Sequence, residues 1–327
     1  MKFLHTSDLH YGAAPDANRP WGKERAAVLK DAFDRIIRAC RRENVDMLII
    51  AGDLFDCLPT EEDIRKVNES FATIPDTRVI ILPGKSDALF VSSPVLTYPW
   101  QDNVTYVSNR NASGEAVSFP AFYDEASGIL AAVCRPEDVE LPDRFSYVAL
   151  GGRHCAEVIR ENHMVYSGSP EPVTSADSGT HGYYIGEIND SRELTSLEFI
   201  SVPTVSYISL QINVTPASTN EEVLRNIRSE INSRGSKNIY TLQLKGMCDP
   251  AVTFDLKPLL SEFRIYEVFD RTEPKYDFRQ LFKDHPSDMV GFFVKEMNRA
   301  DISDLDRKAL YYGVNALLKT ADERSSV

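Results

Sequence analysis

The sequence predicts an α/β protein in three parts: a layered α/β domain at residues 1–202, a small α+β domain at residues 203–275 and a helical segment at residues 276–327. Apolar runs typical of buried strands alternate with helical spacing through the first part, which is the order of a layered α/β domain. A proline-containing segment at residues 200–204 then marks a boundary, and a chain of 327 residues is long enough for two domains.

The elements of the first part follow from local patterns. Apolar residues recur at helical spacing between residues 23 and 43. The segment Thr60-Glu-Glu-Asp combines a capping residue with an acidic first turn, which favours a helix start. The strands expected around these helices begin at Lys2 and continue at 45–51, 78–82, 104–107, 116–121, 128–134 and 145–154, with edge hairpin strands that start at Met164 and Gly182.

The rest of the chain predicts alternating strands and helices, and then helices alone. Strands are expected at 206–214, 239–245 and 263–269, and helices at 220–232, 254–262, 287–299 and 303–318. Apolar residues of the last two helices include Phe292, Phe293, Met297, Leu305, Leu310, Tyr311 and Leu317. They are expected to form a core, and a docking surface for a partner is the alternative. The polar end, residues 321–327, is expected to fray.

Composition and charge exclude some classes of protein. No run of about 18 apolar residues occurs, so no membrane span is expected. The five cysteines are scattered without a C-x-x-C pair, which favours reduced thiols, and a cytoplasmic protein without a leader peptide is expected. A formal net charge of −13 repels phosphate backbones, so contact with nucleic acid requires a local basic patch, a bound metal or a basic partner.

Acidic and histidine side chains follow three of the predicted strands. Asp8 and His10 stand two residues apart, and on an extended segment such residues point to the same side, where both can reach one cation. Asp53 follows the second strand, and Asp87 follows the third. Three apolar strands with acidic loops predict one site at the carboxyl edge of a single sheet, and strand-end capping without a metal is the alternative.

Four short blocks and one longer segment carry a resemblance to a known family. The blocks are Asp8-x-His10, Gly52-Asp53-x-x-Asp56, Gly84-x-x-Asp87 and Gly151-x-x-His154, and the segment is Gly168-Ser-Pro-Glu-Pro172. Together they resemble the calcineurin-like metallophosphoesterases, and among these the SbcD-like DNA repair exonucleases. The resemblance covers residues 1–200 and extends more weakly to a capping domain at 206–270. It implies a four-layer α/β sandwich in which two divalent metals, usually manganese, clamp a phosphodiester.

The resemblance implies a complete first metal site. Carried over by position, its ligands are Asp8, His10, the bridging Asp53 and His154. Oxygen and imidazole ligands suit manganese or iron and tolerate zinc. The alternative for His154 is a loop histidine satisfied by its neighbours. Asp56 is expected to support a turn or a ligand rather than to bind the ion.

The second metal site implied by the resemblance is incomplete. Its asparagine position is Lys85, one histidine position is Gly152, and the strand around Val133 offers no histidine. The position of the catalytic histidine is Ser86, and Asp87, which would orient that histidine, is kept. Two cations at ~4 Å repel by roughly 1 to 4 kcal/mol, so a lysine at this place discourages a second ion.

The sequence thus predicts a metallophosphoesterase-family phosphodiesterase, similar to DNA double-strand-break repair exonucleases, that runs on one divalent metal with reduced activity. Its candidate catalytic residues are Asp53, Lys85 and Asp87. Lys85 would neutralise part of the charge on Asp53, and the alternative is that it points to solvent. The second hypothesis is a catalytically inactive assembly subunit for the coiled-coil repair ATPase that partners this family. DNA, that ATPase and a second copy of the chain are the expected partners, and a small nucleotide stays open as a substrate.

The remaining histidines and basic residues have plainer expectations. His5 is expected in the core, and His163, His181 and His285 are expected on the surface. Arg153 is expected to face water rather than phosphate. A solvated face is expected for the basic residues of the second domain, which are Arg225, Arg228, Arg234, Lys237 and Lys245.

Overall fold

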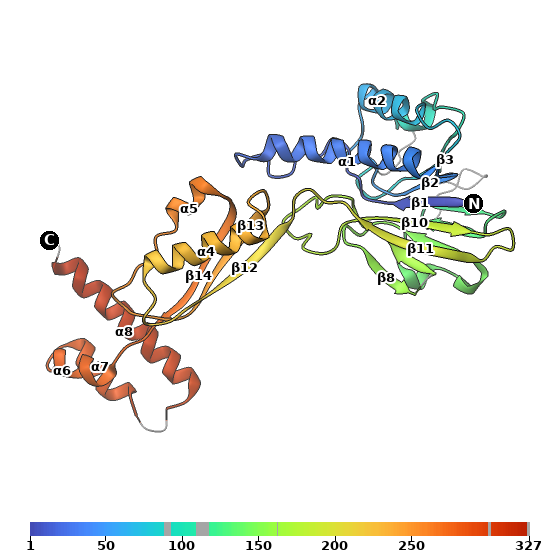
Figure 1. Ribbon diagram of the computed structural model, residues 1–327. Helices are drawn as coiled ribbons and strands as arrows, with labels where there is room; N and C mark the ends of the chain where they lie inside the picture. The colour runs from blue at the N-terminus through green and yellow to red at the C-terminus, as the bar shows by residue number, and fades with distance from the viewer. Residues whose placement is uncertain (88–92, 109–117, 162, 300–301, 326–327) are drawn as a thin grey trace. The chain divides into compact units, whose positions relative to one another are not determined.

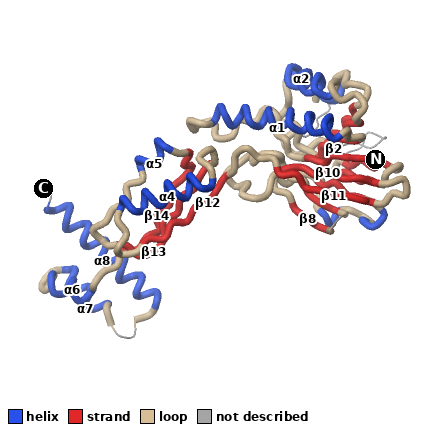
Figure 2. Tube along the Cα trace, in the orientation of Figure 1, coloured by secondary structure: helices blue, strands red, loops and turns tan. Residues whose placement is uncertain are grey.

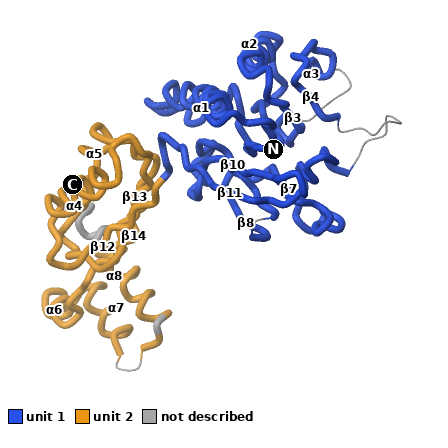
Figure 3. The backbone as a smooth tube through the Cα atoms, turned by 45° about the vertical axis from the view of Figure 1, so that its right-hand side comes forward, with its two compact units in different colours: residues 1–207 blue, residues 208–327 orange. Residues whose placement is uncertain are grey.

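The structure, a computed structural model, describes residues 1–87, 93–108, 118–161, 163–299 and 302–325. The chain divides into two compact units, Met1–Tyr207 and Ile208–Val327, which Figure 3 shows in different colours. No helix among the described residues is long and apolar enough to cross a membrane. The predicted boundary at residue 202 and the further division at residue 275 stay predictions.

The first unit is built on a six-stranded sheet with the strand order β11-β10-β1-β2-β3-β4. Figure 1 labels β1, β2, β3, β10 and β11 of this sheet, and Figure 2 draws the strands in red. Its strands are β1 (Lys2–Thr6), β2 (Met47–Ala51), β3 (Arg78–Leu82), β4 (Val104–Tyr106), β10 (Gly182–Ile188) and β11 (Leu194–Ser201). Strands β1 to β4 are parallel, and β10 joins β1 in antiparallel orientation. The four parallel strands therefore end at the same edge of the sheet, where their loops can meet.

Alternation of side chains gives this sheet two apolar faces. On β1, Leu4 packs into the core formed with the helices, while Phe3 faces a second sheet. The residues of β2 and β3 alternate in the same way. The covering helices are α1 (Gly22–Glu43) and α2 (Glu61–Phe71), and a short helix α3 (Pro94–Thr97) precedes β4. The helix start predicted at residue 60 is confirmed by a reciprocal capping box.

The second sheet of this unit has five strands in the order β5-β6-β7-β9-β8. They are β5 (Ala121–Asp124), β6 (Ile129–Ala132), β7 (Tyr147–Leu150), β8 (Glu157–Arg160) and β9 (Met164–Tyr166). Its outer face buries Val148 and Leu150 together with Val139, beside the short 3-10 helices η1 (Pro136–Asp138) and η2 (Pro142–Arg144). The layers are therefore helices α1 and α2, the six-stranded sheet, the five-stranded sheet, and the short 3-10 helices on its outer face. The predicted α/β sandwich is confirmed.

Two strands expected at sheet edges are interior strands. β9 lies between β7 and β8, and β10 lies between β1 and β11. The sequence prediction lacks the edge strands β8 and β11, because polar residues interrupt their apolar ones and neither strand forms an apolar run. Of the strand expected at 116–121, residues 116–117 lie outside the described part of the chain, and Ala121 begins β5.

The second unit carries a three-stranded sheet in the order β12-β13-β14. Its elements are β12 (Tyr207–Val214), α4 (Asn220–Arg234), β13 (Ile239–Cys248), α5 (Lys257–Glu262), β14 (Arg264–Pro274), α6 (Phe278–Asp284), α7 (Met289–Met297) and α8 (Asp304–Ser325). Of the core residues expected in the last helices, Leu310 is buried, whereas Phe292 and Leu305 are exposed. α8 also continues to Ser325, beyond the end predicted at residue 318.

Candidate metal centre

Loops from both sheets of the first unit build the site. Asp8 and His10 follow β1, and Asp53 follows β2. His154 follows β7, which belongs to the five-stranded sheet. The sequence predicts a site at the edge of a single sheet, and His154 corrects this, because a second sheet supplies it. The inner faces of the two sheets share one apolar core, so the carboxyl ends of β1, β2 and β7 come together.

Asp8, His10 and Asp53 all adopt left-handed backbone conformations, with φ of 51°, 46° and 50°. Strand alternation is not what aligns Asp8 with His10, because β1 ends at Thr6. Hydrogen bonds from Asp8 N to Gly52 O (3.0 Å) and from His10 N to Asp53 O (2.9 Å) join the two loops instead. Such conformations cost roughly 1 to 3 kcal/mol each for residues other than glycine, and they cluster at functional sites.

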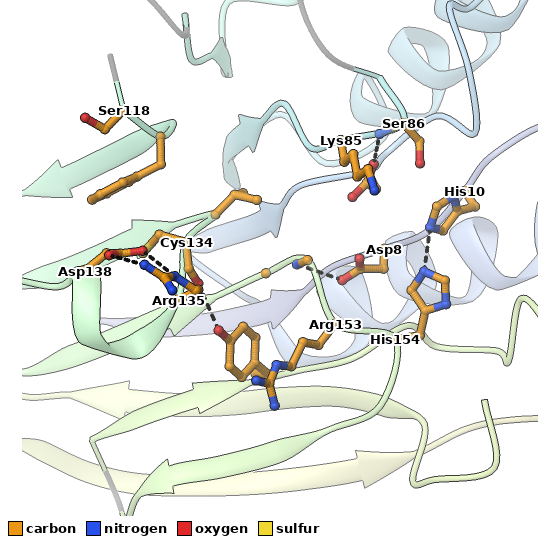
Figure 4. Close-up of a pocket in the computed structure, with 16 residues that line it drawn as sticks. Asp8, His10, Lys85, Ser86, Ser118, Cys134, Arg135, Asp138, Arg153 and His154 are labelled. Atoms are coloured by element: carbon orange, nitrogen blue, oxygen red, sulfur yellow. Dashed lines mark hydrogen bonds and ion pairs between the residues drawn. The ribbon is translucent and has the colours of Figure 1, made fainter. Parts of the chain in front are cut away.

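Asp8, His10 and His154 form a cluster whose ligand atoms all lie within 4.8 Å of one another. The Nε2 atoms of His10 and His154 are 3.1 Å apart (Figure 4). Two nitrogens that each lie about 2.1 Å from one ion can adopt this separation. One carboxylate oxygen and two imidazole nitrogens are donors that suit manganese, iron or zinc.

A carboxylate lies at the Nδ1 atom of each imidazole, on the side of the ring opposite Nε2. His10 Nδ1 lies 3.0 Å from Asp56 Oδ1, and His154 Nδ1 lies 2.9 Å from Asp177 Oδ2. An ionised carboxylate only accepts hydrogen bonds, so each Nδ1 carries a hydrogen, and in a neutral ring Nε2 then presents a lone pair. Facing lone pairs repel unless a proton or a metal ion lies between them. The residues present therefore fit a divalent ion.

Burial shifts the pKa values of Asp8 and His10 toward their uncharged forms. Burial raises the pKa of Asp8 to about 7, and its hydrogen bonds offset this only in part. Burial lowers the pKa of His10, whereas the hydrogen bond with Asp177 raises the pKa of His154. Although burial opposes it, the hydrogen bond from His154 helps to lower the pKa of Asp177 to about 2. A divalent ion would stabilise the charged form of Asp8 in this buried place.

Asp53 lines the same cavity but is not part of the three-residue cluster found among the described residues. Its Oδ1 accepts a hydrogen bond from Ser86 N at 2.5 Å, and its carboxylate packs against Gly84. The loop after β3 therefore holds the Asp53 carboxylate in place. The four ligands predicted from the sequence thus line one cavity. The contacts that position Asp53 come from Gly84 and Ser86.

The cavity has a volume of about 420 Å³, and three cations line it: Lys85, Arg135 and Arg153 (Figure 4). Arg135 pairs with Asp138 at 3.1 Å, and Arg153 pairs with Glu157. In the described part of the chain Lys85 forms no ion pair, and Figure 4 shows its side chain directed into the cavity. Lys85 is exposed to solvent and, of these three cations, is the one without a carboxylate partner among the described residues.

Residues around the expected second metal site do not fit an ion. Gly152 N donates a hydrogen bond to Asp8 Oδ2 at 3.2 Å, and this residue has no side chain to offer. Burial raises the pKa of the Cys134 thiol to about 12, which opposes formation of the thiolate that a metal ion binds. Lys85 is an ammonium, which has no lone pair to donate. Among the described residues, Gly152 and Lys85 therefore offer no ligand to a second ion, and burial disfavours Cys134 as one.

Asp87 contacts backbone amides, whereas the resemblance paired it with a histidine. Its Oδ1 accepts a hydrogen bond from Gly84 N at 2.6 Å, and its Oδ2 accepts one from Phe55 N at 3.2 Å. Burial raises the pKa of Asp87 to about 6. Asp87 thus ties the loops after β2 and β3 together, and it is not among the described residues that line the cavity.

Asp177 and His181 belong to this site, although the sequence prediction lacks Asp177 and places His181 on the surface. His181 is buried, with 3% of its surface exposed, which corrects that expectation. Its Nε2 lies 3.2 Å from Asp177 O. Asp177 follows His154 by 23 residues and belongs to no recognised block, so no pattern in the sequence points to it.

Comparison with known proteins gives the relationships of this chain. Residues 1–159 match the family model for calcineurin-like phosphoesterases. A protein of Methanopyrus kandleri named DNA double-strand break repair protein Mre11 is 23% identical over 288 residues, with coverage of 70% of this chain and 62% of the relative. A protein of the same name from Archaeoglobus fulgidus is 38% identical over 71 residues, which cover 21% of this chain and 15% of the relative. The chain thus spans less than two thirds of either relative.

One solved structure has a weak likeness to this chain. It is Yfce, a phosphoesterase from E. coli, and it covers 62% of this chain and 100% of its own. The TM-score is 0.31 and the sequence identity is 14%.

Proposed function

Residues 1–159 belong to the calcineurin-like phosphoesterase family, and on that premise we propose that this protein is a phosphodiesterase that works with one divalent cation. Manganese is the first choice for the ion, with iron or zinc as alternatives. The two relatives named as DNA double-strand break repair proteins support DNA as the substrate class. A small nucleotide is the second substrate to test, because a net charge of −13 disfavours a long phosphate backbone.

The short distance between the imidazoles of His10 and His154 is the main observation that supports this proposal. His10 and His154 bring their Nε2 atoms to 3.1 Å while carboxylates hold both Nδ1 atoms. With Asp8 they would hold the ion, and Asp53, which lines the same cavity, is the fourth candidate ligand. When bound, such an ion supplies Lewis acidity to a phosphoryl oxygen and to an attacking water.

The charges around the cavity suit a phosphodiester. Asp8 and Asp53 contribute two negative charges, one divalent ion would contribute two positive charges, and Lys85 adds a third. One positive charge therefore remains for the single negative charge of a phosphodiester. Because Arg135 and Arg153 are already paired with carboxylates, Lys85 is the residue proposed to stabilise charge that develops on the phosphoryl group.

Ser86 limits how well the protein could protonate the leaving group. It stands where the resemblance places the histidine that assists the leaving group, and a serine hydroxyl is too weak an acid for that role. General acid catalysis contributes roughly 10²- to 10⁴-fold to rate, and this contribution would be missing. We therefore expect reduced activity that favours substrates with good leaving groups.

A catalytically inactive assembly subunit for a coiled-coil ATPase is the second candidate function. The loss of the second metal site and of the leaving-group histidine favours it. Exposed apolar residues on the last helices, Phe292 on α7 and Leu305 on α8, offer a surface for such a partner. For either function we propose a cytoplasmic location, which the five free cysteines support.

Manganese-dependent hydrolysis of bis-p-nitrophenyl phosphate tests the proposal. Asp53→Asn is the informative variant, because asparagine keeps the volume of the side chain and tolerates the left-handed backbone of this position. The exposed Asp190→Ala variant serves as the control. We expect turnover by the wild type and by Asp190→Ala, and a loss in Asp53→Asn. Absence of any Asp53-dependent turnover would leave the assembly function as the better explanation.

A further inference from the structure

We infer that Asp177 is a positioning residue for the metal centre, where it holds the His154 imidazole in the orientation and tautomer that present Nε2 to the ion. Nothing in the sequence motifs assigns Asp177 a role. The inference rests on the proposed metal site, but it concerns a residue that would not touch the ion. Its chemistry is that of a carboxylate behind a ligating histidine, which fixes the ring and raises its basicity.

The hydrogen bonds of Asp177 fix its carboxylate in space. Its Oδ2 accepts hydrogen bonds from His154 Nδ1 at 2.9 Å, from Val173 N at 2.9 Å and from Thr174 N at 2.7 Å. Its side chain is 11% exposed. Three donors on one oxygen leave this carboxylate little freedom, so the ring that donates to it is oriented as well.

The backbone on both sides of this contact is also anchored. Ser169 N donates a hydrogen bond to His154 O at 2.9 Å. The buried His181 bridges Asp177 and Ser169, with Nε2 at 3.2 Å from Asp177 O and Nδ1 at 3.2 Å from Ser169 O. His154 is therefore held at its carbonyl by Ser169 and at its ring by Asp177, and one imidazole connects the two supports.

Asp56 provides an internal comparison, because it stands behind His10 as Asp177 stands behind His154. His10 Nδ1 lies 3.0 Å from Asp56 Oδ1, but the Asp56 side chain is 41% exposed. Water competes for an exposed carboxylate and weakens its hold on a partner. The structure therefore makes Asp177 the stronger of the two supports.

A structural role in the turn is the competing explanation, since Asp177 also accepts two backbone amides. Manganese affinity, measured by calorimetry on variants of this whole chain, separates the positioning role from a structural role in the turn. We expect Asp177→Ala to bind manganese roughly 10- to 100-fold more weakly, and Asp177→Asn, which keeps an acceptor without the charge, to lie between it and the wild type. Thr174→Ala is the matched control, because it removes only the hydrogen bond from Ala176 N in the same turn.

Two results overturn the inference. One is unchanged affinity in both Asp177 variants, and the other is an equal loss in Thr174→Ala, which would assign the effect to the order of the turn. Nitrogen NMR of the metal-free protein gives an independent readout. We expect His154 to carry its hydrogen on Nδ1 in the wild type and to lose that preference in Asp177→Ala. A wild type that binds no manganese defeats the proposed function, and the tautomer experiment still decides the role of Asp177.

Discussion

The carboxylate of Asp53 lies directly against the backbone of Gly84, so that a Cβ atom added at Gly84 would fall 2.3 Å from Cγ of Asp53. The clash involves a buried carboxylate that also accepts a hydrogen bond from Ser86 N. A side chain at position 84 cannot be placed without moving Asp53. The absence of a side chain at this glycine is thus what allows the loop after β3 to hold the candidate ligand.

Gly84→Ala should therefore remove activity as well as stability. We expect a loss of about 1 to 3 kcal/mol in the free energy of unfolding, measured by urea denaturation, and a large fall in manganese-dependent hydrolysis. Gly235→Ala is the control: its φ of 110° makes alanine costly, but the residue ends α4 in the second unit. That variant should be destabilised and keep its activity. Full activity in Gly84→Ala would show that the position of Asp53 does not matter.

Lys85→Met tests the charge in the cavity, because methionine keeps much of the aliphatic stem and removes the ammonium. We expect turnover to fall about 100-fold, as when one stabilising donor is removed from a transition state, with manganese affinity unchanged or higher. Lys66→Met, on the exposed face of α2, is the matched control. Metal content measured by emission spectroscopy should be one ion per chain in the wild type. Two stoichiometric ions per wild-type chain would rule out Lys85 as a replacement for the second metal.

Ser86→His should restore a leaving-group acid. The wild-type rate is expected to depend steeply on the acidity of the leaving group, since Ser86 is too weak an acid to protonate it. In Ser86→His the hydrolysis of esters with poor leaving groups should rise by roughly 10²- to 10⁴-fold, while p-nitrophenyl esters change little. The comparison needs a series of phosphodiesters measured under the same conditions. Equal gains for good and poor leaving groups would argue against this account of Ser86.

His5 makes stability depend on pH, and the direction follows from its burial. Burial lowers the pKa of His5 to about 3, while the unfolded chain has a value near 6.5. Between these values the unfolded state binds a proton that the folded state does not, so stability falls as the pH decreases, by up to about 1.4 kcal/mol per pH unit. His5→Gln, which can keep a hydrogen bond to Tyr147 OH, should show a weaker dependence.

Urea unfolding of the wild type and His5→Gln between pH 7 and pH 4 checks this prediction. The difference between the two proteins is the quantity to compare, because Asp8 acts in the opposite direction. Burial raises the pKa of Asp8 to about 7, so in the metal-free protein its contribution to stability rises as the pH falls through that value. Parallel curves for wild type and variant would mean that His5 is protonated to the same extent in both states.

Local patterns were sufficient for the elements whose cause is local. α1, β3 and the capped start of α2 at Thr60 agree with their predictions, since helical spacing and a capping box depend only on residues a few positions apart. The edge strands β8 and β11 were not predicted, because their pairing depends on partner strands, and neither sequence forms an apolar run of its own. The buried position of His181 was not predicted for the same kind of reason.

The sequence by itself determined that acidic and histidine side chains follow apolar strands, and it identified the blocks that contain Asp8, His10, Asp53 and His154. Only the tertiary structure decided that His154 reaches His10 from a second sheet, across 144 positions of the chain, and that Asp177 stands behind it. The physical reason is that a ligand set is a property of distances in space. Those distances depend on how two sheets pack and how loops are hydrogen-bonded, which residue spacing along the chain does not contain.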